Sequence, residues 1–252
     1  FSNTKNTLIQ KYKKKIKAIM PVLTMGQEIN FRKYEKFAKE KNLKVIFDAA
    51  ACHNPKIIQK KGLSNSIYCF SFNGNKTLTT GAGGILATNS KSLANKARIL
   101  SNVGKVKGNY DYQDIGYNYK MTNIQANLGL SQLKNLNKIL KKKKIIFNYY
   151  EKKLKDNSNF FIIHDKNHIN WVFALILKRQ NKFKIIKRIF NNNNIQLDYF
   201  WKPLHLQNPY KKFKKSKLVT SEIVWKKVIV LPSHPGVSKT NQNKICKILN
   251  KI

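Results

Sequence analysis

The sequence predicts an α/β domain followed by a smaller α+β lobe. Two patterns predict this arrangement. In the first half of the chain, short apolar runs typical of buried strands alternate with stretches of helical spacing. A long amphipathic stretch then leads into a second group of strands and helices. We therefore expect a large domain over residues 1–140 and a smaller domain over residues 141–252.

The first half of the chain opens with a βαβ pattern. The apolar run AIMPV is followed by a stretch whose apolar residues recur at helical spacing, and then by a second apolar run, LKVIFDAA. Two further apolar runs flank a glycine-rich stretch, and a serine precedes the next helical pattern as a cap. The predicted elements are a strand at 18–22, a helix at 29–42, strands at 43–50, 66–72 and 84–89, and a helix at 90–103.

The second half is expected to begin with one long helix, because apolar residues recur at helical spacing from residue 121 to about residue 154. The four lysines at 141–144 are interpreted as a solvated face of that helix. The elements predicted after it are a strand at 170–177, a helix at 182–190, a strand at 228–232 and a helix at 238–250.

The chain is strongly basic, with 50 Lys and Arg residues against 11 Asp and Glu and a formal net charge of +39. Such a charge is compatible with nucleic acid or an anionic membrane surface as a partner. Only four of the basic residues are arginines, however, and arginine is the side chain that nucleic-acid readers favour. A compositional drift toward Lys, Asn and Ile explains the charge without a polyanion. We expect no nucleic-acid and no membrane partner, and we keep a basic polyanion-binding protein as an alternative.

The three cysteines, Cys52, Cys69 and Cys246, are odd in number and far apart. They lack the Cys and His spacing typical of a zinc site, so we expect neither a disulfide framework nor a metal. Such cysteine usage is typical of the reducing cytoplasm. No apolar run in the sequence approaches the roughly 20 residues that a membrane span needs.

Polar side chains stand at the ends of two predicted neighbouring strands. Asp48 ends one strand, and Ser71 and Lys76 lie at and just after the end of the next. Because ligands of open α/β sheets bind beyond the carboxyl ends of the strands, a carboxylate and an amine are expected to face one crevice. Pyridoxal 5'-phosphate uses that combination: a lysine binds its aldehyde as a Schiff base, and an acid pairs with its ring nitrogen. The hydroxyl of Ser71 is placed to bind its phosphate.

Each of these residues also has a plainer interpretation. An Asp at a strand end is often a turn or cap residue, and a single lysine in so basic a chain is often a surface residue. The glycines at 81, 83 and 84 are compatible with a simple hairpin. From the residues alone, a cofactor site and an ordinary surface loop both stay open.

Four motifs, in register over nearly the whole chain, bear on these alternatives. They are VIFDAAACHN, FSFNGNKTLTTGAGGILATN, DIGYNYKMTNIQANLGLSQL, and FWKPLHLQNPY with VIVLPSHPGVS. In this order and spacing they resemble the sugar-nucleotide aminotransferases of the DegT/StrS (DegT/DnrJ/EryC/StrS) type, which are fold-type I pyridoxal-phosphate enzymes. The resemblance implies a fold-type I large domain, truncated at its N-terminus, with a smaller C-terminal α+β lobe.

The segments SFNGNKTLTTG and WKPLHLQ look most like those of one branch of this family. That branch aminates C4 of UDP-linked 4-keto-6-deoxy-N-acetylhexosamines of the bacillosamine and legionaminic-acid type. GDP-perosamine synthases are close relatives, so a GDP-linked sugar stays open as an alternative substrate.

The resemblance also implies a role for each residue that matches its motifs. Lys76 matches the Schiff-base lysine and Asp48 matches the partner of the pyridinium nitrogen, so these two are the catalytic candidates. Ser71 matches a phosphate ligand. Asn118, in GYNYK, matches an asparagine that reaches the phosphate of the neighbouring subunit.

Two histidines match positions near the sugar nucleotide and are the candidate substrate residues. His205 lies in KPLHLQ, where a packed or capping histidine is an equally good interpretation. His53 occupies a recurrent position in DAAACH, to which the resemblance assigns no definite chemical role.

The implied reaction moves an amino group, with glutamate as the usual donor, to the 4-keto carbon of a nucleotide-linked sugar. It serves the biosynthesis of a surface polysaccharide or glycan such as lipopolysaccharide. The implied assembly is a cytoplasmic homodimer with its active site at the subunit interface. The family's N-terminal portion, whose Gly/Ser/Thr turn holds the phosphate, finds no match in this sequence. An inactive or partial gene product of the same family is therefore a second alternative.

Overall fold

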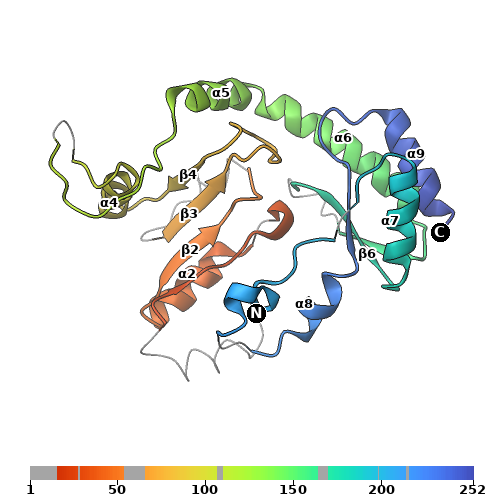
Figure 1. The fold of residues 1–252 in the computed structure, drawn as a ribbon, viewed down its shortest axis with the longest axis horizontal. Helices are drawn as coiled ribbons and strands as arrows, with labels where there is room; N and C mark the ends of the chain where they lie inside the picture. The colour runs from red at the N-terminus through yellow and green to blue at the C-terminus, as the bar shows by residue number, and fades with distance from the viewer. Residues whose placement is uncertain are drawn as a thin grey trace. The chain divides into compact units, whose positions relative to one another are not determined.

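The protein is described by a computed structural model in which the chain divides into two compact units. The N-terminal unit lies within residues 14–139 and 167–171, and the C-terminal unit lies within residues 140–166 and 172–252. We propose a division near residue 140 as the domain boundary. The structure describes residues 16–27, 29–53, 66–106, 110–163, 170–197, 199–213 and 216–252 (Figure 1).

The N-terminal unit is built on a sheet with the following elements. They are β1 Ala18–Ile19, the 3-10 helix η1 Thr24–Gly26, α2 Phe31–Glu40, β2 Lys44–Asp48, β3 Ser66–Ser71 and β4 Gly84–Ala87. Among the residues that the structure describes, the strands follow the order β1-β2-β3-β4 (Figure 1). β1, β2 and β3 are parallel, and β4 pairs antiparallel with β3. Because α2 connects the parallel strands β1 and β2, the predicted βαβ unit is confirmed.

Aromatic side chains form the core between α2 and the sheet. Phe47, on β2, is fully buried. The centroid of its ring lies 5.0 Å from that of Phe31 on α2 and 4.8 Å from that of Tyr68 on β3. Aromatic side chains bury large apolar areas, so this cluster stabilises the pairing of β2 with β3. It thereby fixes the two strand ends at which the candidate site lies.

The helix α4 (Lys91–Ser101) follows β4 and confirms the predicted serine cap. The Oγ of Ser90 accepts a hydrogen bond from the backbone N–H of Leu93 at 3.4 Å. Just after the helix, Gly104 has a positive φ of 80°, and a Cβ at this position would lie 1.8 Å from the carbonyl oxygen of Asp114. Only glycine allows the backbone at Asp114 to approach so closely to the residues that follow α4.

The single helix predicted from residue 121 to about residue 154 is wrong. The structure has two helices, α5 (Asn123–Lys134) and α6 (Leu136–Leu154), which Asn135 separates with φ −95° and ψ 1°. The side-chain Nδ2 of Asn135 donates a hydrogen bond to the carbonyl oxygen of Ser131 at 3.1 Å. Asparagine side chains compete in this way for the backbone groups that a continuous helix needs. The apolar periodicity continues across the break and therefore conceals it.

The C-terminal unit contains an antiparallel sheet in the order β5-β6-β7. One hydrophobic cluster joins this sheet to α6, α7 and α9, with Tyr150 and Phe173 fully buried and their ring centroids 5.2 Å apart. The predicted strands and helices of this half are confirmed, whereas β5 and α8 were not predicted. The bounds are β5 Phe160–Ile163, β6 Phe173–Leu177, α7 Lys182–Asn192, the 3-10 helices η2 Leu204–Leu206 and η3 Asn208–Tyr210, α8 Val219–Val224, β7 Val228–Leu231 and α9 Lys239–Asn250.

In the part of the chain that the structure describes, no helix combines the length and the apolar composition needed to cross a bilayer. The same described residues contain no group of three or more His, Cys, Asp or Glu side chains arranged to hold a metal ion.

Lys143 departs from the predicted solvated run at 141–144. The helical period puts its side chain on the face of α6 that carries Phe147 and Tyr150, and Lys143 is only 5% exposed. Its Nζ donates a hydrogen bond to the carbonyl oxygen of Ser233 at 3.2 Å. Burial lowers the pKa of Lys143 to about 8. The interpretation of the run as solvated is therefore wrong at this position and correct for its three exposed neighbours.

Lys143→Met is expected to raise the free energy of unfolding at pH 7 by about 1 to 2 kcal/mol. The penalty for charging a buried amine with this pKa is about 3 kcal/mol at about 1.4 kcal/mol per unit, and the hydrogen bond to Ser233 offsets part of it. Because the pKa is lower in the folded state, the unfolded chain binds more protons between about pH 8 and pH 10.5. The free energy of unfolding of the wild type therefore gains a rising contribution across that window, which the variant lacks.

Urea titrations of both proteins at pH 7 and pH 10 measure this difference. Lys142→Met is the matched control, since Lys142 is the exposed neighbour on the same helix and its loss should change the free energy of unfolding by less than about 0.5 kcal/mol. Identical pH dependence in Lys143→Met and the wild type would contradict the burial of a titrating amine.

Candidate active site

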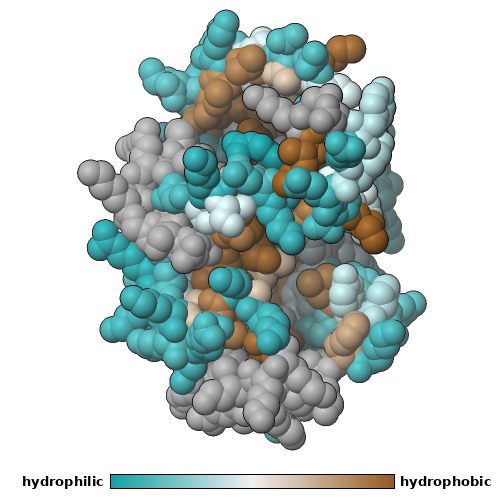
Figure 2. Space-filling model, turned by 90° about the vertical axis from the view of Figure 1, so that its left-hand side faces the viewer, coloured by the Kyte–Doolittle hydropathy of each residue, from teal (hydrophilic) through white to brown (hydrophobic). Residues whose placement is uncertain are grey.

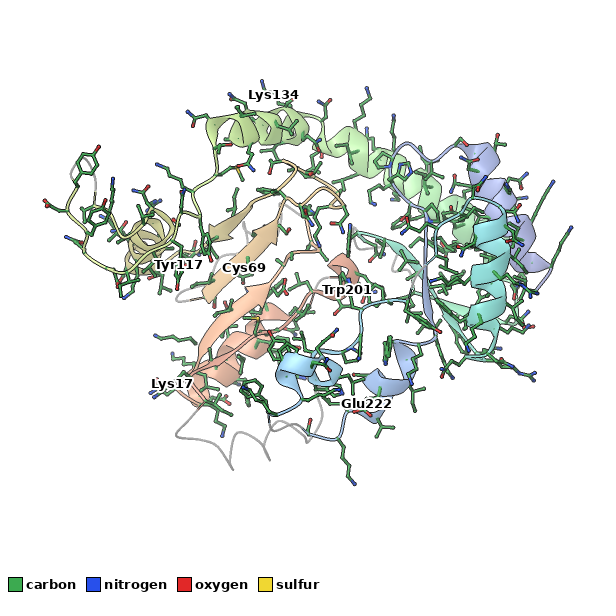
Figure 3. The ribbon with its side chains drawn as sticks, viewed as in Figure 1. Lys17, Cys69, Tyr117, Lys134, Trp201 and Glu222 are labelled. Atoms are coloured by element: carbon green, nitrogen blue, oxygen red, sulfur yellow. The ribbon has the colours of Figure 1, made fainter. Side chains whose placement is uncertain are left out.

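Asp48 and Ser71 lie at the carboxyl ends of two adjacent parallel strands. Asp48 is the last residue of β2, and Ser71 is the last residue of β3. The register pairs Asp48 with Cys69. Cys69 lies on β3 (Figure 3), two residues before Ser71. The Oδ1 of Asp48 accepts a hydrogen bond from the backbone N–H of Ala50 at 3.0 Å, which orients the carboxylate. The two strand ends are therefore neighbours, as the sequence predicts.

Lys76 lies in the loop that joins β3 to β4. Its backbone N–H donates a hydrogen bond to the carbonyl oxygen of Asn73 at 3.0 Å, which closes a turn. Further along, the backbone N–H of Thr80 donates to the carbonyl oxygen of Phe72 at 2.9 Å. Gly81 follows with a positive φ of 79°, a conformation that favours glycine. The hairpin interpretation is thus correct for the backbone, and the same hairpin loop carries Lys76 beyond the strand end.

The side chain of Lys76 is half-buried and lies over an aromatic ring. Its Nζ is 3.9 Å from the ring centroid of Trp171, which is itself 9% exposed. Burial lowers the pKa of Lys76, and the negative charge of Asp48 acts in the opposite direction. An amine with a lowered pKa is neutral for a larger part of the time near pH 7, as a nucleophile or a proton acceptor must be. The carboxylate of Asp48 and the amine of Lys76 therefore interact electrostatically within the N-terminal unit.

His53 supports the end of β3. Its Nε2 lies 2.9 Å from the carbonyl oxygen of Ser71 and carries the proton of this hydrogen bond, because a carbonyl oxygen only accepts. His53 is 8% exposed, and its ring centroid lies 6.0 Å from that of Phe72. The structure thus gives His53 a contact with the backbone of the candidate phosphate ligand. Its role toward a substrate stays a prediction.

Asn118 lies on another segment of the N-terminal unit. It is exposed and forms a backbone bridge with Asn102 just after α4. The preceding residue, Tyr117, lies beside α4 and donates its backbone N–H to the carbonyl oxygen of Leu100 at 2.7 Å (Figure 3). The role of Asn118 at the phosphate of a neighbouring subunit stays a prediction.

His205 belongs to the C-terminal unit. It lies in η2, and its Nε2 is 2.9 Å from the Oε1 of Glu222. Glu222 lies on α8 (Figure 3). This contact joins two segments of the unit and supports the interpretation of a structural histidine. A contact between His205 and a sugar nucleotide stays a prediction.

The cluster of Lys76, Asp48 and Ser71 fits pyridoxal phosphate on chemical grounds. The aldehyde of this cofactor needs a partly neutral amine, its ring nitrogen needs an oriented carboxylate, and its phosphate needs hydrogen-bond donors. The lowered pKa of Lys76, the hydrogen bond that orients Asp48 and the hydroxyl of Ser71 meet these three needs. The site therefore has the groups for amine chemistry on a carbonyl compound.

Residues 4–250 match the DegT/DnrJ/EryC1/StrS aminotransferase family. The chain belongs to this family. Its members are pyridoxal-phosphate-dependent sugar aminotransferases, so the predicted family, enzyme class and cofactor are confirmed at the level of the family.

Curated relatives match along most of the chain. The GDP-perosamine synthase of Escherichia coli O157:H7 is 30% identical over 248 residues, which cover 96% of this chain and 67% of the relative. The UDP-4-amino-4,6-dideoxy-N-acetyl-beta-L-altrosamine transaminase of Helicobacter pylori is 28% identical over 234 residues, which cover 88% of this chain and 62% of the relative. The chain thus spans about two thirds of the length of these relatives.

Solved structures agree with the predicted fold. A DegT DnrJ EryC1 StrS aminotransferase from Brucella abortus is 27% identical and has a TM-score of 0.80, covering 93% of this chain and 64% of its own. Helicobacter pylori PseC, an aminotransferase involved in the biosynthesis of pseudoaminic acid, has a TM-score of 0.83 at 24% identity, covering 93% of this chain and 66% of its own. The predicted fold-type I class is therefore confirmed.

Two contacts of the Lys76 loop were not predicted from the sequence. The indole Nε1–H of Trp171 donates a hydrogen bond to the carbonyl oxygen of Asn75 at 2.8 Å, across 96 positions of sequence. The backbone N–H of Thr79 donates to the Oε1 of Gln132, on α5, at 3.2 Å. Both contacts join residues that are distant in sequence, so no local pattern signals them.

Proposed function

We propose that the complete protein moves an amino group from glutamate to C4 of a nucleotide-linked 4-keto-6-deoxy sugar, with pyridoxal phosphate as cofactor. The proposed substrate is a UDP-linked N-acetylhexosamine, which the sequence motifs favour and which agrees with the name of the Helicobacter pylori relative. A GDP-linked sugar is the alternative, from the name of the Escherichia coli relative. One observation carries the proposal: in a chain of this family, the half-buried amine of Lys76 interacts electrostatically with the carboxylate of Asp48, at the end of the neighbouring strand.

In this proposal Asp48 and Lys76 have distinct tasks. When bound, pyridoxal phosphate supplies an electron sink and a carrier for the amino group. The carboxylate of Asp48 pairs with the ring nitrogen and keeps a proton on it, because a nearby negative charge favours the protonated form. The Nζ of Lys76 binds the cofactor and moves the proton at the reacting substrate carbon, for which its lowered pKa suits it.

The phosphate is held by hydroxyl and amide donors in this proposal. The Oγ of Ser71 accepts the backbone N–H of Asn73 at 3.3 Å, which leaves its own O–H proton to donate to the phosphate. Asn118 of a second copy donates its side-chain amide to the same phosphate. The site is then complete only in a homodimer.

Exposed apolar side chains support a homodimer. Ile115, Tyr119 and Ile124, which lie close to Asn118 in the sequence, are 87%, 75% and 83% exposed. The helix α5 that follows buries none of its residues. Figure 2 views the molecule from the side of α4 and shows hydrophobic surface between hydrophilic side chains. Large apolar side chains exposed along one segment are typical of an interaction surface, and we propose that a second copy covers them.

We further propose that the protein works in the cytoplasm and supplies an amino sugar for lipopolysaccharide or another surface glycan. Cys52, Cys69 and Cys246 are all free thiols, as is usual in a reducing compartment. The glycan role follows from the proposed sugar substrate.

Isotope transfer tests the reaction directly. The protein in its full natural length, loaded with pyridoxal phosphate, is incubated with ¹⁵N-glutamate and a UDP-linked 4-keto-6-deoxy-N-acetylhexosamine. We expect ¹⁵N in the sugar nucleotide by mass spectrometry, together with an equal amount of 2-oxoglutarate. Transfer to the matching GDP-linked sugar alone would reassign the nucleotide, and transfer to neither sugar would contradict the proposed function.

The 252-residue chain is expected to bind pyridoxal phosphate at least about a hundredfold more weakly than a chain that adds the N-terminal portion of its relatives. The resemblance assigns the main phosphate-binding turn to that portion, and two or three charge-assisted hydrogen bonds contribute about 1.5 to 3 kcal/mol each. Cofactor titrations of both chains measure the difference, and sedimentation counts the subunits. Equal affinities, or a tightly binding and fully active monomer, would contradict the proposed phosphate site.

A further inference from the structure

Trp171 contacts both the side chain and the turn of Lys76. Its ring lies over the amine, with the Nζ of Lys76 at 3.9 Å from the ring centroid. Its Nε1–H donates a hydrogen bond to the carbonyl oxygen of Asn75 at 2.8 Å. Its own backbone N–H donates to the carbonyl oxygen of Met25 at 2.8 Å. Trp171 is therefore anchored through its backbone while its indole reaches the residue before Lys76 and the amine itself.

The turn that carries Lys76 needs such support. Asn73, Gly74 and Asn75 are all exposed. A lysine side chain also has a flexible four-carbon stem, so a lysine on an exposed turn samples many positions. The hydrogen bond from Trp171 restrains the backbone beside Lys76, and the ring attracts the charged amine, since tryptophan is the best aromatic partner of an ammonium group.

We propose that Trp171 is a positioning residue for Lys76: its ring holds the amine beside the ends of β2 and β3, and its indole N–H fixes the turn. This inference rests on the proposed role of Lys76. All of the contacts lie within the N-terminal unit, so they can be tested without cofactor.

The two parts of the indole can be separated by substitution. Leucine at position 171 keeps an apolar cover over the amine but removes the π face that favours the ammonium form. The neutral fraction of Lys76 should therefore rise. Phenylalanine keeps a π face and removes only the N–H donor to Asn75. The carboxylate of Asp48, whose charge also acts on the amine, is unchanged in both variants.

Competitive labelling with an amine-reactive reagent, followed by peptide mass spectrometry over a pH series, reports the pKa of Lys76 in the cofactor-free protein. In Trp171→Leu we expect a pKa lower by about 0.5 to 1 unit, and labelling at pH 7 that is about three- to tenfold faster. In Trp171→Phe we expect labelling within about twofold of the wild type. Hydrogen exchange at the amide of Lys76 should be about fivefold faster in both variants, because both lose the bond to Asn75.

Two controls keep the result specific. Hydrogen exchange at the backbone amides of β2 and β3, in the same unit as Trp171, is measured in the same samples, and unchanged rates there show that this unit is folded in each variant. Trp225→Leu removes another tryptophan with a lysine over its ring, Lys226 at 5.8 Å, and should leave Lys76 unchanged. An unchanged or raised pKa of Lys76 in Trp171→Leu would overturn the role of the ring. Unchanged exchange in Trp171→Phe would overturn the role of the N–H, and both results stand even if the cofactor never binds.

Discussion

Lys76→Ala is expected to abolish covalent capture of pyridoxal phosphate and to lower amino transfer by at least about 10³-fold. The amine of Lys76 is half-buried and interacts electrostatically with Asp48, and burial lowers its pKa. Removing it takes away both the group that binds the aldehyde and the group that moves the proton. Borohydride reduction of the loaded protein, followed by peptide mapping, should show the adduct on the peptide of Lys76 in the wild type and on no peptide of the variant.

Lys105→Ala is the matched control for this experiment. The Nζ of Lys105 also lies over an aromatic ring, at 4.2 Å from the ring centroid of Tyr110, but it stands after α4 instead of beside Asp48. This variant should keep the adduct and the activity. A trapped adduct of unchanged yield in Lys76→Ala would show that another amine holds the cofactor.

The features that were predicted from the sequence depend on local patterns. Strand ends follow from runs of apolar residues, so the placement of Asp48 and Ser71 on adjacent strands could be predicted without a structure. The cap of α4 at Ser90 follows in the same way from one residue type before a helical pattern.

The features that were missed arise where two local tendencies compete, or where two residues that meet are far apart in the sequence. At Asn135 the apolar period favours a continuous helix, while the asparagine side chain ends it through a hydrogen bond to the backbone. At Lys143 the residue type predicts exposure, while the helical period places the side chain on the buried face of α6. Trp171 and Lys76 meet only because the chain returns to the N-terminal unit after α6, which no pattern near either residue reveals.

Asp48→Asn is expected to lower turnover by about 10²- to 10³-fold while some cofactor still binds. The asparagine has nearly the same shape, and its Oδ1 still accepts the backbone N–H of Ala50, so the end of β2 should keep its structure. What is lost is the negative charge that keeps the ring nitrogen protonated. A fall of two to three units in the pKa of that nitrogen corresponds to about 3 to 4 kcal/mol, which accounts for the expected loss of rate.

Asp114→Asn is the matched control, because the Oδ1 of Asp114 also accepts a neighbouring backbone N–H, that of Ile115 at 2.9 Å. It should leave turnover within about twofold of the wild type. A second measurement needs no cofactor. The charge of Asp48 raises the pKa of Lys76 against the effect of burial, so in Asp48→Asn the pKa of Lys76 should fall further and its labelling at pH 7 should become faster. Near-normal turnover would remove Asp48 from the mechanism, and unchanged labelling of Lys76 would mean that the carboxylate and the amine do not share one site.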